Sequence, residues 1–203
     1  MRDVMRIGYF GGTFDPPHLG HEILAMETIC QLKLDSVKWL ITPDPPHKSD
    51  REIISIDSRL EMLKLVTSKY DEFSISTVDL ERSPPYYAAD TARIIKEQRP
   101  DDELVYIIGE DSLRDLPGWY KPEALLAHID QLAVAPRPGF ETKLDELEDK
   151  LPGLSDKTVF LSGISMEISS SLIRRRILDG TRYEHFLSQE IVMYIRENGL
   201  YRH

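Results

Sequence analysis

The sequence predicts an α/β domain with a central parallel sheet flanked by helices. Short apolar, β-branched runs alternate with segments of helical periodicity, and this spacing is typical of right-handed βαβ units. No repeat period or low-complexity tract breaks the alternation. The 203 residues are enough for one domain with a sizeable core, so we expect residues 1–203 to form a single domain.

The elements follow one another in the order that such a sheet requires. The expected strands are the apolar runs Val4–Phe10, Val37–Ile41, Phe73–Ser76, Leu104–Ile108, Leu132–Ala135 and Thr158–Leu161. The expected helices, which show helical spacing of apolar residues, are Leu19–Lys33, Asp57–Ser68, Tyr87–Gln98 and Pro122–His128. Within the first helix, the residues expected on one apolar side are Leu19, Ile23, Met26 and Ile29. Cys30 falls in the same pattern and is therefore expected in the core.

Two segments lack this regularity. Thr42–Ile54 contains three prolines and no periodicity, so it is expected to be a long loop after the second strand. Arg137–Asp156 starts with Arg-Pro-Gly and then becomes acidic and amphipathic, which favours a surface helix. In open parallel sheets, ligands bind outside the carboxyl ends of the strands. The candidate motifs all follow strands, so they are expected to converge at that edge.

Composition narrows the function classes. The single cysteine forbids an intramolecular disulfide and fits a reducing compartment. With no apolar stretch of membrane-spanning length and no signal peptide, we expect a cytoplasmic protein without membrane partners. A net charge of −10 argues against nucleic-acid binding, which needs a broad basic surface. An anionic small molecule can still bind, because local donors dominate at short range.

The most informative segment is Gly11–His21, which directly follows the first apolar run. Paired glycines, Gly11 and Gly12, let the backbone approach an anion without an intervening Cβ. His18 and His21 lie three residues apart at the expected helix start, where the N–H groups and the dipole favour negative charge. Two imidazoles there can donate hydrogen bonds to phosphate oxygens. The segment matches neither G-x-G-x-x-G nor a Walker A loop.

Two later strings complete the pattern. Ile168–Arg174 reads as a serine-rich helix start with a guanidinium one turn further on, which suits an anion at the cap. Gly109-Glu110-Asp111 follows an expected strand, and Asp111 could accept from a substrate hydroxyl or cap the next helix. Trp119 could stack on a flat ring or simply pack in the core.

These strings resemble signatures of the nucleotidyltransferase superfamily. Gly11–His21 is similar to its T/HxGH motif, Ile168–Arg174 to ISSTxIR with Ser171 at the usual threonine position, and Gly109–Asp111 to GxD. The resemblance implies a Rossmann-like nucleotidyltransferase fold.

Further motifs resemble the bacterial nicotinate-mononucleotide adenylyltransferases. They are PPHK at 45–48, GxDxxxxLPxW at 109–119, VxxRPGF at 134–140, and the terminal stretch 192–201. The resemblance spans essentially the whole chain. It implies transfer of AMP from ATP to nicotinate mononucleotide, with release of pyrophosphate.

The resemblance also implies site residues. The expected catalytic residues are His18, His21 and Arg174. The expected ATP-binding residues are Gly11, Gly12, Thr13, Phe14, His18, His21, Lys48, Gly109, Asp111, Ile168, Ser169, Ser170 and Arg174. The expected residues around nicotinate mononucleotide are Gly12, Thr13, Phe14, Lys48, Tyr87, Ala88, Asp111, Trp119, Tyr120 and Arg137. Mg²⁺ is expected on the ATP phosphates, without a dedicated protein metal site.

The chain departs from the family pattern PSYTxDT. Tyr86 and Ala88 replace the serine and threonine, although the main-chain N–H of Ala88 remains.

Three alternative functions are a pantetheine-phosphate adenylyltransferase, a non-catalytic nucleotide sensor and a tRNA-synthetase fragment. The first is disfavoured by the PPHK loop, and the second by the intact His18, His21 and Arg174. The third is disfavoured by the acidic net charge. A homodimer is left open.

Overall fold

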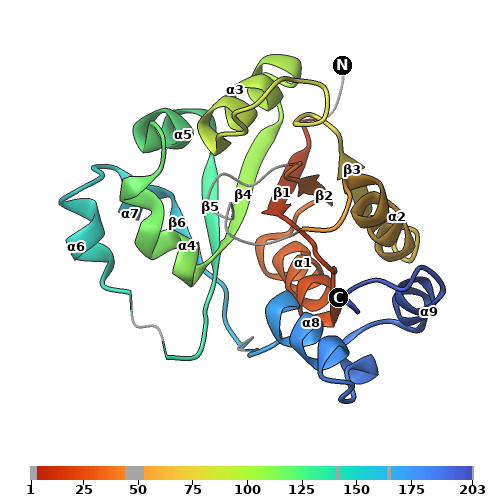
Figure 1. Cartoon of the computed structure of the whole chain (residues 1–203). Helices are drawn as coiled ribbons and strands as arrows, with labels where there is room; N and C mark the ends of the chain where they lie inside the picture. Colours follow the sequence, from red (N-terminus) through yellow and green to blue (C-terminus); the bar gives the residue numbers. More distant parts are fainter. Residues whose placement is uncertain (1–3, 44–52, 140–141, 164–165, 203) are drawn as a thin grey trace.

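The computed structural model describes residues 4–43, 53–139, 142–163 and 166–202. In these ranges six parallel strands form one sheet in the order β3-β2-β1-β4-β5-β6 (Figure 1). They are β1 (Arg6–Gly12), β2 (Ser36–Ile41), β3 (Phe73–Ser76), β4 (Glu103–Gly109), β5 (Gln131–Ala135) and β6 (Thr158–Phe160). The strand order reverses between β1 and β4, the switch point at which doubly wound sheets bind ligands. The predicted fold class is confirmed.

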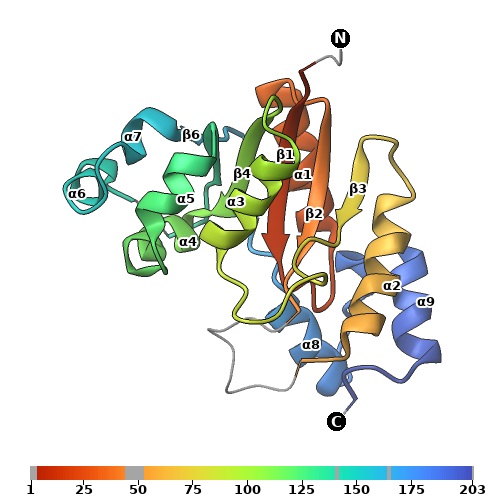
Figure 2. The ribbon, with the colours of Figure 1, turned by 90° about the horizontal axis from the view of Figure 1, so that it is seen from above.

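Helices cover both faces of this sheet. They are α1 (Leu19–Leu32), α2 (Ile56–Thr67), α3 (Ala88–Gln98), α4 (Glu110–Asp115), α5 (Pro122–His128), α6 (Leu144–Glu148), α7 (Leu154–Lys157), α8 (Ser170–Leu178) and α9 (Gln189–Glu197). One core cluster joins the sheet to α3, α4 and α5, and the other joins it to α1, α2, α8 and α9. Figure 2 shows α8 beyond the arrowhead end of β1, where it can contribute to the ligand edge.

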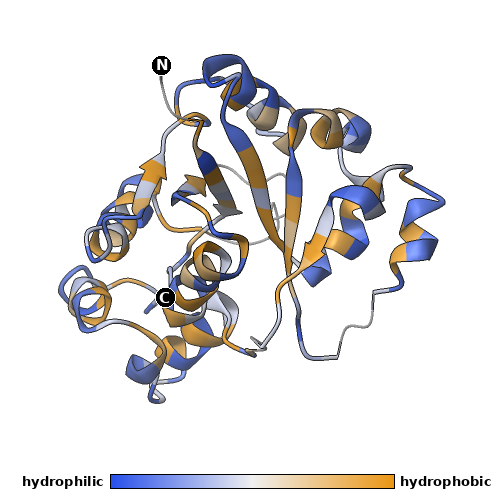
Figure 3. Ribbon diagram, turned by 180° about the vertical axis from the view of Figure 1, so that it is seen from behind, coloured by the Kyte–Doolittle hydropathy of each residue, from blue (hydrophilic) through white to orange (hydrophobic). Residues whose placement is uncertain are grey.

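The hydropathy of the ribbon follows this layering. Figure 3 shows apolar residues along the strands and on the inner sides of helices, with polar residues on the outer sides. Val105 and Ile107 of β4 face one cluster, while Leu104 and Tyr106 face the other. A central strand covered on both faces therefore reads as an unbroken apolar run. None of the helices in the described ranges combines the length and the apolar character needed to span a bilayer.

The first strand continues further than its sequence predicts. Gly11 and Gly12 pair with Leu40 and Ile41 of β2, so the glycines belong to the strand. The chain leaves the sheet only after Gly12, at Thr13. Pairing with β2 supplies the hydrogen bonds at these two positions, which outweigh the weak strand preference of glycine.

The predicted inner face of α1 is only partly correct, because Met26 and Ile29 pack against the core cluster but are not its most buried residues. Its buried residues are Gly20, Glu22, Ala25 and Thr28. Ile23 is 43% exposed, and Cys30 is exposed rather than in the core. Small side chains let the helix approach the sheet closely. Glu22 is tolerated there because Lys69 Nζ lies 3.1 Å from its carboxylate. Apolar spacing alone therefore did not identify the most buried positions of the helix.

The remaining differences concern loops and short helices. The expected acidic helix is two short helices, α6 and α7, separated by a turn in which Gly153 has φ of +85°. The helix α4 follows β4 without a gap and was not predicted. Of the expected loop Thr42–Ile54, residues 44–52 lie outside the described residues, including Lys48 of the PPHK motif.

Candidate active site

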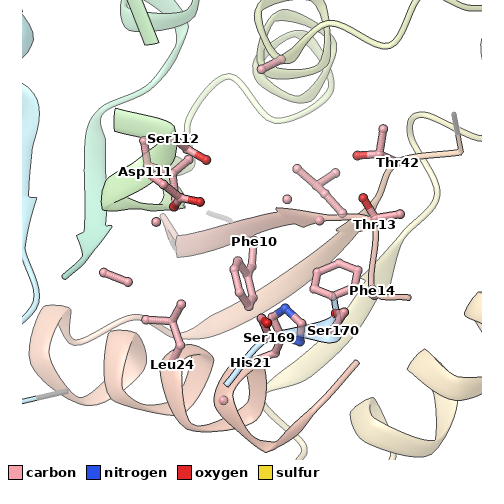
Figure 4. Close-up of a pocket in the computed structure, with 18 of the residues that line it drawn as sticks. Phe10, Thr13, Phe14, His21, Leu24, Thr42, Asp111, Ser112, Ser169 and Ser170 are labelled. Atoms are coloured by element: carbon pink, nitrogen blue, oxygen red, sulfur yellow. The ribbon is translucent and has the colours of Figure 1, made fainter. Parts of the chain in front are cut away.

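A pocket of about 560 Å³ opens at the carboxyl ends of β1, β4 and β5. Figure 4 shows side chains from the β1 end, from α1, from α4 and from the start of α8 around it. The predicted site residues that line it are Gly11, Gly12, Thr13, Phe14, His18, His21, Tyr87, Ala88, Gly109, Asp111, Trp119, Tyr120, Arg137, Ile168, Ser169 and Ser170. Segments that are far apart in the sequence therefore meet at the switch point.

Two predicted residues stand apart from this set. Lys48 lies outside the described residues. Arg174 lies just behind the wall, where Nη2 donates to the hydroxyl of Ser171, itself a lining residue, at 3.0 Å. The guanidinium is thus one side chain away from the pocket.

His18 and His21 form the floor at the start of α1. Their rings stack with centroids 3.6 Å apart, as their spacing on the first turn predicts. The main-chain N–H of His18 donates to Nδ1 of His21 at 3.2 Å, which assigns the proton of a neutral His21 to Nε2. The His21 ring also lies against Phe10 and Phe14, with centroids 5.8 and 5.2 Å away (Figure 4). The Nε2–H group of His21 is therefore held as a rigid hydrogen-bond donor at the start of the helix.

His18 is neutral in this environment. Burial, together with the positive charge of Arg137, lowers its pKa from 6.5 to about 3. His18 is 5% exposed, and its ring cannot carry a charge at neutral pH without a bound anion. His18 can thus act on phosphate as a neutral hydrogen-bond donor.

Asp15 links the turn after β1 to the C-terminal part of the chain. Nη1 of Arg174 donates to its main-chain oxygen at 2.6 Å, and the same nitrogen lies 3.6 Å from Oδ2. The hydroxyl of Tyr201 donates to Oδ1 at 2.9 Å. Burial and the negative charge of Asp15 raise the pKa of Tyr201, so its hydroxyl keeps its proton. No pattern in the sequence pointed to these roles of Asp15 and Tyr201.

The start of α8 presents hydroxyl groups to the same place. Ser169 is the N-cap, and its side chain accepts from the N–H of Leu172 at 3.2 Å. The hydroxyl of Ser170 donates to the main-chain oxygen of Pro16 at 2.9 Å. These contacts join the serine-rich string to the Gly11–His21 segment and leave the helix N-terminus at the pocket. The two halves of the predicted phosphate site are adjacent.

The opposite wall is built on α4. Nε of Arg137 lies 3.2 Å from Oδ1 of Asp111, so Arg137 braces this wall and lines it. The N-cap of α4 is Gly109, and a Cβ there would overlap Asp111. Glu110 was missed by the sequence analysis. Burial alone would raise the pKa of Glu110, but the N–H groups of Arg137 and Thr142 donate to it at 3.0 Å and hold the pKa below its usual value.

Aromatic rings close the pocket near α3. Tyr87 and Tyr120 stack with centroids 4.1 Å apart at an interplanar angle of 21°. Trp119 packs on the core cluster, as one of its two expected roles requires, and it also lines the pocket. Flat rings at one end and phosphate-type donors at the other suit a mononucleotide with an aromatic base.

Arg59 is a further residue that the sequence analysis missed. Its side chain is buried, and Nη1 donates to the main-chain oxygens of Thr13 and Thr42 at 3.0 and 2.8 Å. Nη2 donates to the oxygen of Pro43 at 2.6 Å. Arg59 thereby ties the end of β1 to the end of β2. In the sequence, Arg59 is an arginine that follows a serine in an ordinary amphipathic helix. Nothing there indicates that its side chain is buried.

Comparison with known proteins agrees with this geometry. The cytidylyltransferase-like family model matches residues 9–176. A protein of Dehalococcoides mccartyi named a probable nicotinate-nucleotide adenylyltransferase is 40% identical over 199 residues, which cover 97% of each chain. The nicotinate-nucleotide adenylyltransferase of Bacillus subtilis is 37% identical over 198 residues, covering 98% of this chain and 99% of that protein. The chain belongs to the nicotinate-nucleotide adenylyltransferase family.

A solved structure supports the fold of this nicotinate-nucleotide adenylyltransferase family member. The nicotinic acid mononucleotide adenylyltransferase of Plasmodium falciparum, complexed with NaAD, superposes with a TM-score of 0.77 over 97% of both chains. Its sequence identity is 21%, so this likeness concerns the fold. The resemblance first seen in the motifs is therefore confirmed at the level of family and architecture.

Proposed function

We propose that the protein transfers the adenylyl group of ATP to nicotinate mononucleotide, giving nicotinate adenine dinucleotide and pyrophosphate for NAD biosynthesis. One observation carries the proposal: phosphate-type donors from β1, α1 and α8 and aromatic rings near α3 line a single pocket. Full-length relatives at about 40% identity bear the name of this activity.

The reaction needs no protein nucleophile. A phosphate oxygen of nicotinate mononucleotide attacks the α-phosphorus of ATP and forms the new P–O bond. The bond from the α-phosphorus to the bridging oxygen breaks, and pyrophosphate leaves with the electron pair. Because the attacking phosphate is already ionised near neutral pH, the protein has to align the reactants and stabilise charge.

We assign that stabilisation to the start of α1. His21 donates from Nε2 to an α-phosphate oxygen, and the stacked, neutral His18 donates beside it. Gly11, Gly12, Thr13 and Phe14 supply main-chain contacts at the end of β1. These groups are held in place before substrate arrives, so no reorganisation is needed as charge shifts.

The C-terminal half of the phosphate site is assigned to α8. Ile168, Ser169 and Ser170 contact ATP at the helix start. Arg174 acts from behind them, where its charge lies next to Ser171 and the turn at Asp15. Gly109 and Asp111 are assigned to the adenosine part of ATP. Lys48 is assigned to the phosphates on the PPHK resemblance alone.

The pyridine end is assigned to the aromatic wall. Trp119, Tyr120 and Tyr87 flank the ring, and the first N–H groups of α3, beginning at Ala88, hold the ring carboxylate. Arg137 braces this region through Asp111.

Mg²⁺ is assigned to the ATP phosphates. Within the described ranges, no group of three His, Cys, Asp or Glu side chains is arranged to hold a metal ion. Phosphate oxygens and water, the ligands that Mg²⁺ favours, would then hold it. When bound, the ion neutralises charge on the departing pyrophosphate.

Pyrophosphate release tests this proposal. Purified protein with ATP and Mg²⁺ is offered nicotinate mononucleotide, nicotinamide mononucleotide or phosphopantetheine in a coupled assay. The proposal expects the highest kcat/KM with nicotinate mononucleotide. Turnover of phosphopantetheine alone would assign the chain to the other adenylyltransferase class, and binding of ATP without any turnover would favour a sensor.

A further inference from the structure

A polar cluster with two buried members lies between β3 and α3, beside the pocket. Its members are Asp79, Arg82 and Thr91. Nε of Arg82 donates to Oδ1 of Asp79 at 2.8 Å, and the hydroxyl of Thr91 donates to the same oxygen at 2.7 Å. Asp79 and Thr91 are buried and line the pocket. A buried carboxylate requires a compensating charge, and Arg82 provides it.

The same guanidinium holds the chain that leads into α3. Nη1 of Arg82 donates to the main-chain oxygen of Pro85 at 2.7 Å, and Nη2 donates to the hydroxyl of Thr91 at 3.0 Å. Its Cζ lies 5.2 Å from the centroid of the Tyr86 ring. Arg82 therefore fixes the segment that ends at Ala88, the first residue of α3 and a lining residue.

The charge of Asp79 reaches into the pocket. Tyr106 also lines the pocket, and the pKa of its hydroxyl is raised by burial and by the negative charge of Asp79. An anionic ring substituent bound near α3 would experience the same negative potential from Asp79. Without Arg82 that field would repel an anion, because like charges interact strongly in a site with little water.

We propose that Arg82 is a positioning residue that determines substrate specificity. By neutralising Asp79 and holding the segment before α3, it lets the pocket accept a mononucleotide whose ring bears a carboxylate in preference to the neutral amide. This inference rests on the proposed function, since it concerns the choice between two pyridine mononucleotides.

The test measures kcat/KM for nicotinate and nicotinamide mononucleotide, and KM for ATP, in matched variants. Arg82→Gln should lower the preference for the carboxylate about 10-fold or more, mainly through the KM for nicotinate mononucleotide. The KM for ATP should change less than about threefold. Arg82→Lys keeps the charge and should retain more of the preference. Arg93→Gln, which alters a half-buried arginine of α3 that pairs with Glu97, is the control.

A second variant, Asp79→Asn, should not lower the preference for the carboxylate as Arg82→Gln does. It removes the negative charge but keeps an oxygen for Arg82 and Thr91, so the preference for the carboxylate should rise or stay as high as in the parent. A purely structural role predicts a fall in this variant as well, and that result would overturn the inference. Equal losses for both mononucleotides in Arg82→Gln, with melting curves unchanged, would also overturn it. A parent protein that uses neither mononucleotide would instead refute the proposed function.

Discussion

Arg174 and Asp15 are joined across a sequence separation of 159 residues. Nη1 of Arg174 donates to the main-chain oxygen of Asp15 at 2.6 Å, and Tyr201 donates to the carboxylate of Asp15 from the end of the chain. The turn after β1, the helix α8 and the C-terminal segment thus meet at one buried acidic residue. If the proposed function is correct, the geometry of the phosphate site depends on this junction.

Replacement of Arg174 by lysine tests the junction. The guanidinium contacts Asp15 and Ser171 at the same time, whereas an ammonium cannot reproduce both contacts in that geometry. We expect kcat/KM for ATP to fall about 10- to 100-fold, as for loss of one hydrogen bond involving a charged group. Arg175→Lys, an exposed neighbour on α8, serves as the control. Steady-state kinetics that match the parent would make Arg174 a structural residue only.

His21→Ala should lower kcat far more than it weakens ATP binding. The Nε2 donor is needed mainly as charge develops at the α-phosphate, and removal of one such donor costs about 10²-fold or more. The measurements are kcat and the Kd for ATP, with His128→Ala on α5 as the control. If kcat stayed within about threefold of the parent, the assignment of His21 would be wrong.

Protein stability should fall in mild acid because of His18. Its pKa is lowered by burial from 6.5 to about 3, so between these values the unfolded chain binds a proton that the folded protein does not. The free energy of unfolding therefore decreases as pH falls below about 6.5, by about 1.4 kcal/mol per pH unit from this one group.

Urea unfolding at several pH values checks this sign. His18→Gln lacks the titrating group, so its stability should depend less steeply on pH between about 6 and 4.5, by nearly the amount that His18 contributes. Parallel curves for the variant and the parent would show that His18 is not held neutral by the fold.

Ala88→Pro tests whether a main-chain N–H holds the ring carboxylate. Ala88 is the first residue of α3, where proline fits, and Tyr87 has ψ of 138°, which a following proline favours. The variant should keep its fold and its KM for ATP. Its preference for nicotinate over nicotinamide mononucleotide should fall about 10-fold or more.

The control is Ala88→Thr, which restores the side chain of the family pattern and should change the preference little. A well-folded Ala88→Pro protein with unchanged discrimination would move the carboxylate to another donor, with the main chain of Trp119 and Tyr120 next in place.

The strands and the phosphate motifs were predictable because their signals are local. Apolar β-branched runs mark strands that are buried on both faces, and Gly11–His21 carries its own turn and helix start. The inner face of α1 was only partly predictable from apolar spacing, since its most buried positions include the small residues Gly20, Ala25 and Thr28.

The residues that support the site were missed for a different reason. Arg59, Asp79, Arg82 and Glu110 are charged, and in the sequence they look like members of solvated surfaces. Each is compensated by partners that only the folded chain brings near, such as the main-chain oxygens of Thr13 and Thr42 around Arg59. A single sequence does not contain those distances.

Transfer of a labelled adenylyl group tests the central claim most directly. The protein is incubated with Mg²⁺, nicotinate mononucleotide and ATP labelled at the α-phosphate, and the products are separated and counted. The proposed function predicts that the label appears in nicotinate adenine dinucleotide in amounts equal to the pyrophosphate released, with none bound to protein. Label in AMP or on the protein, without labelled dinucleotide, would contradict it.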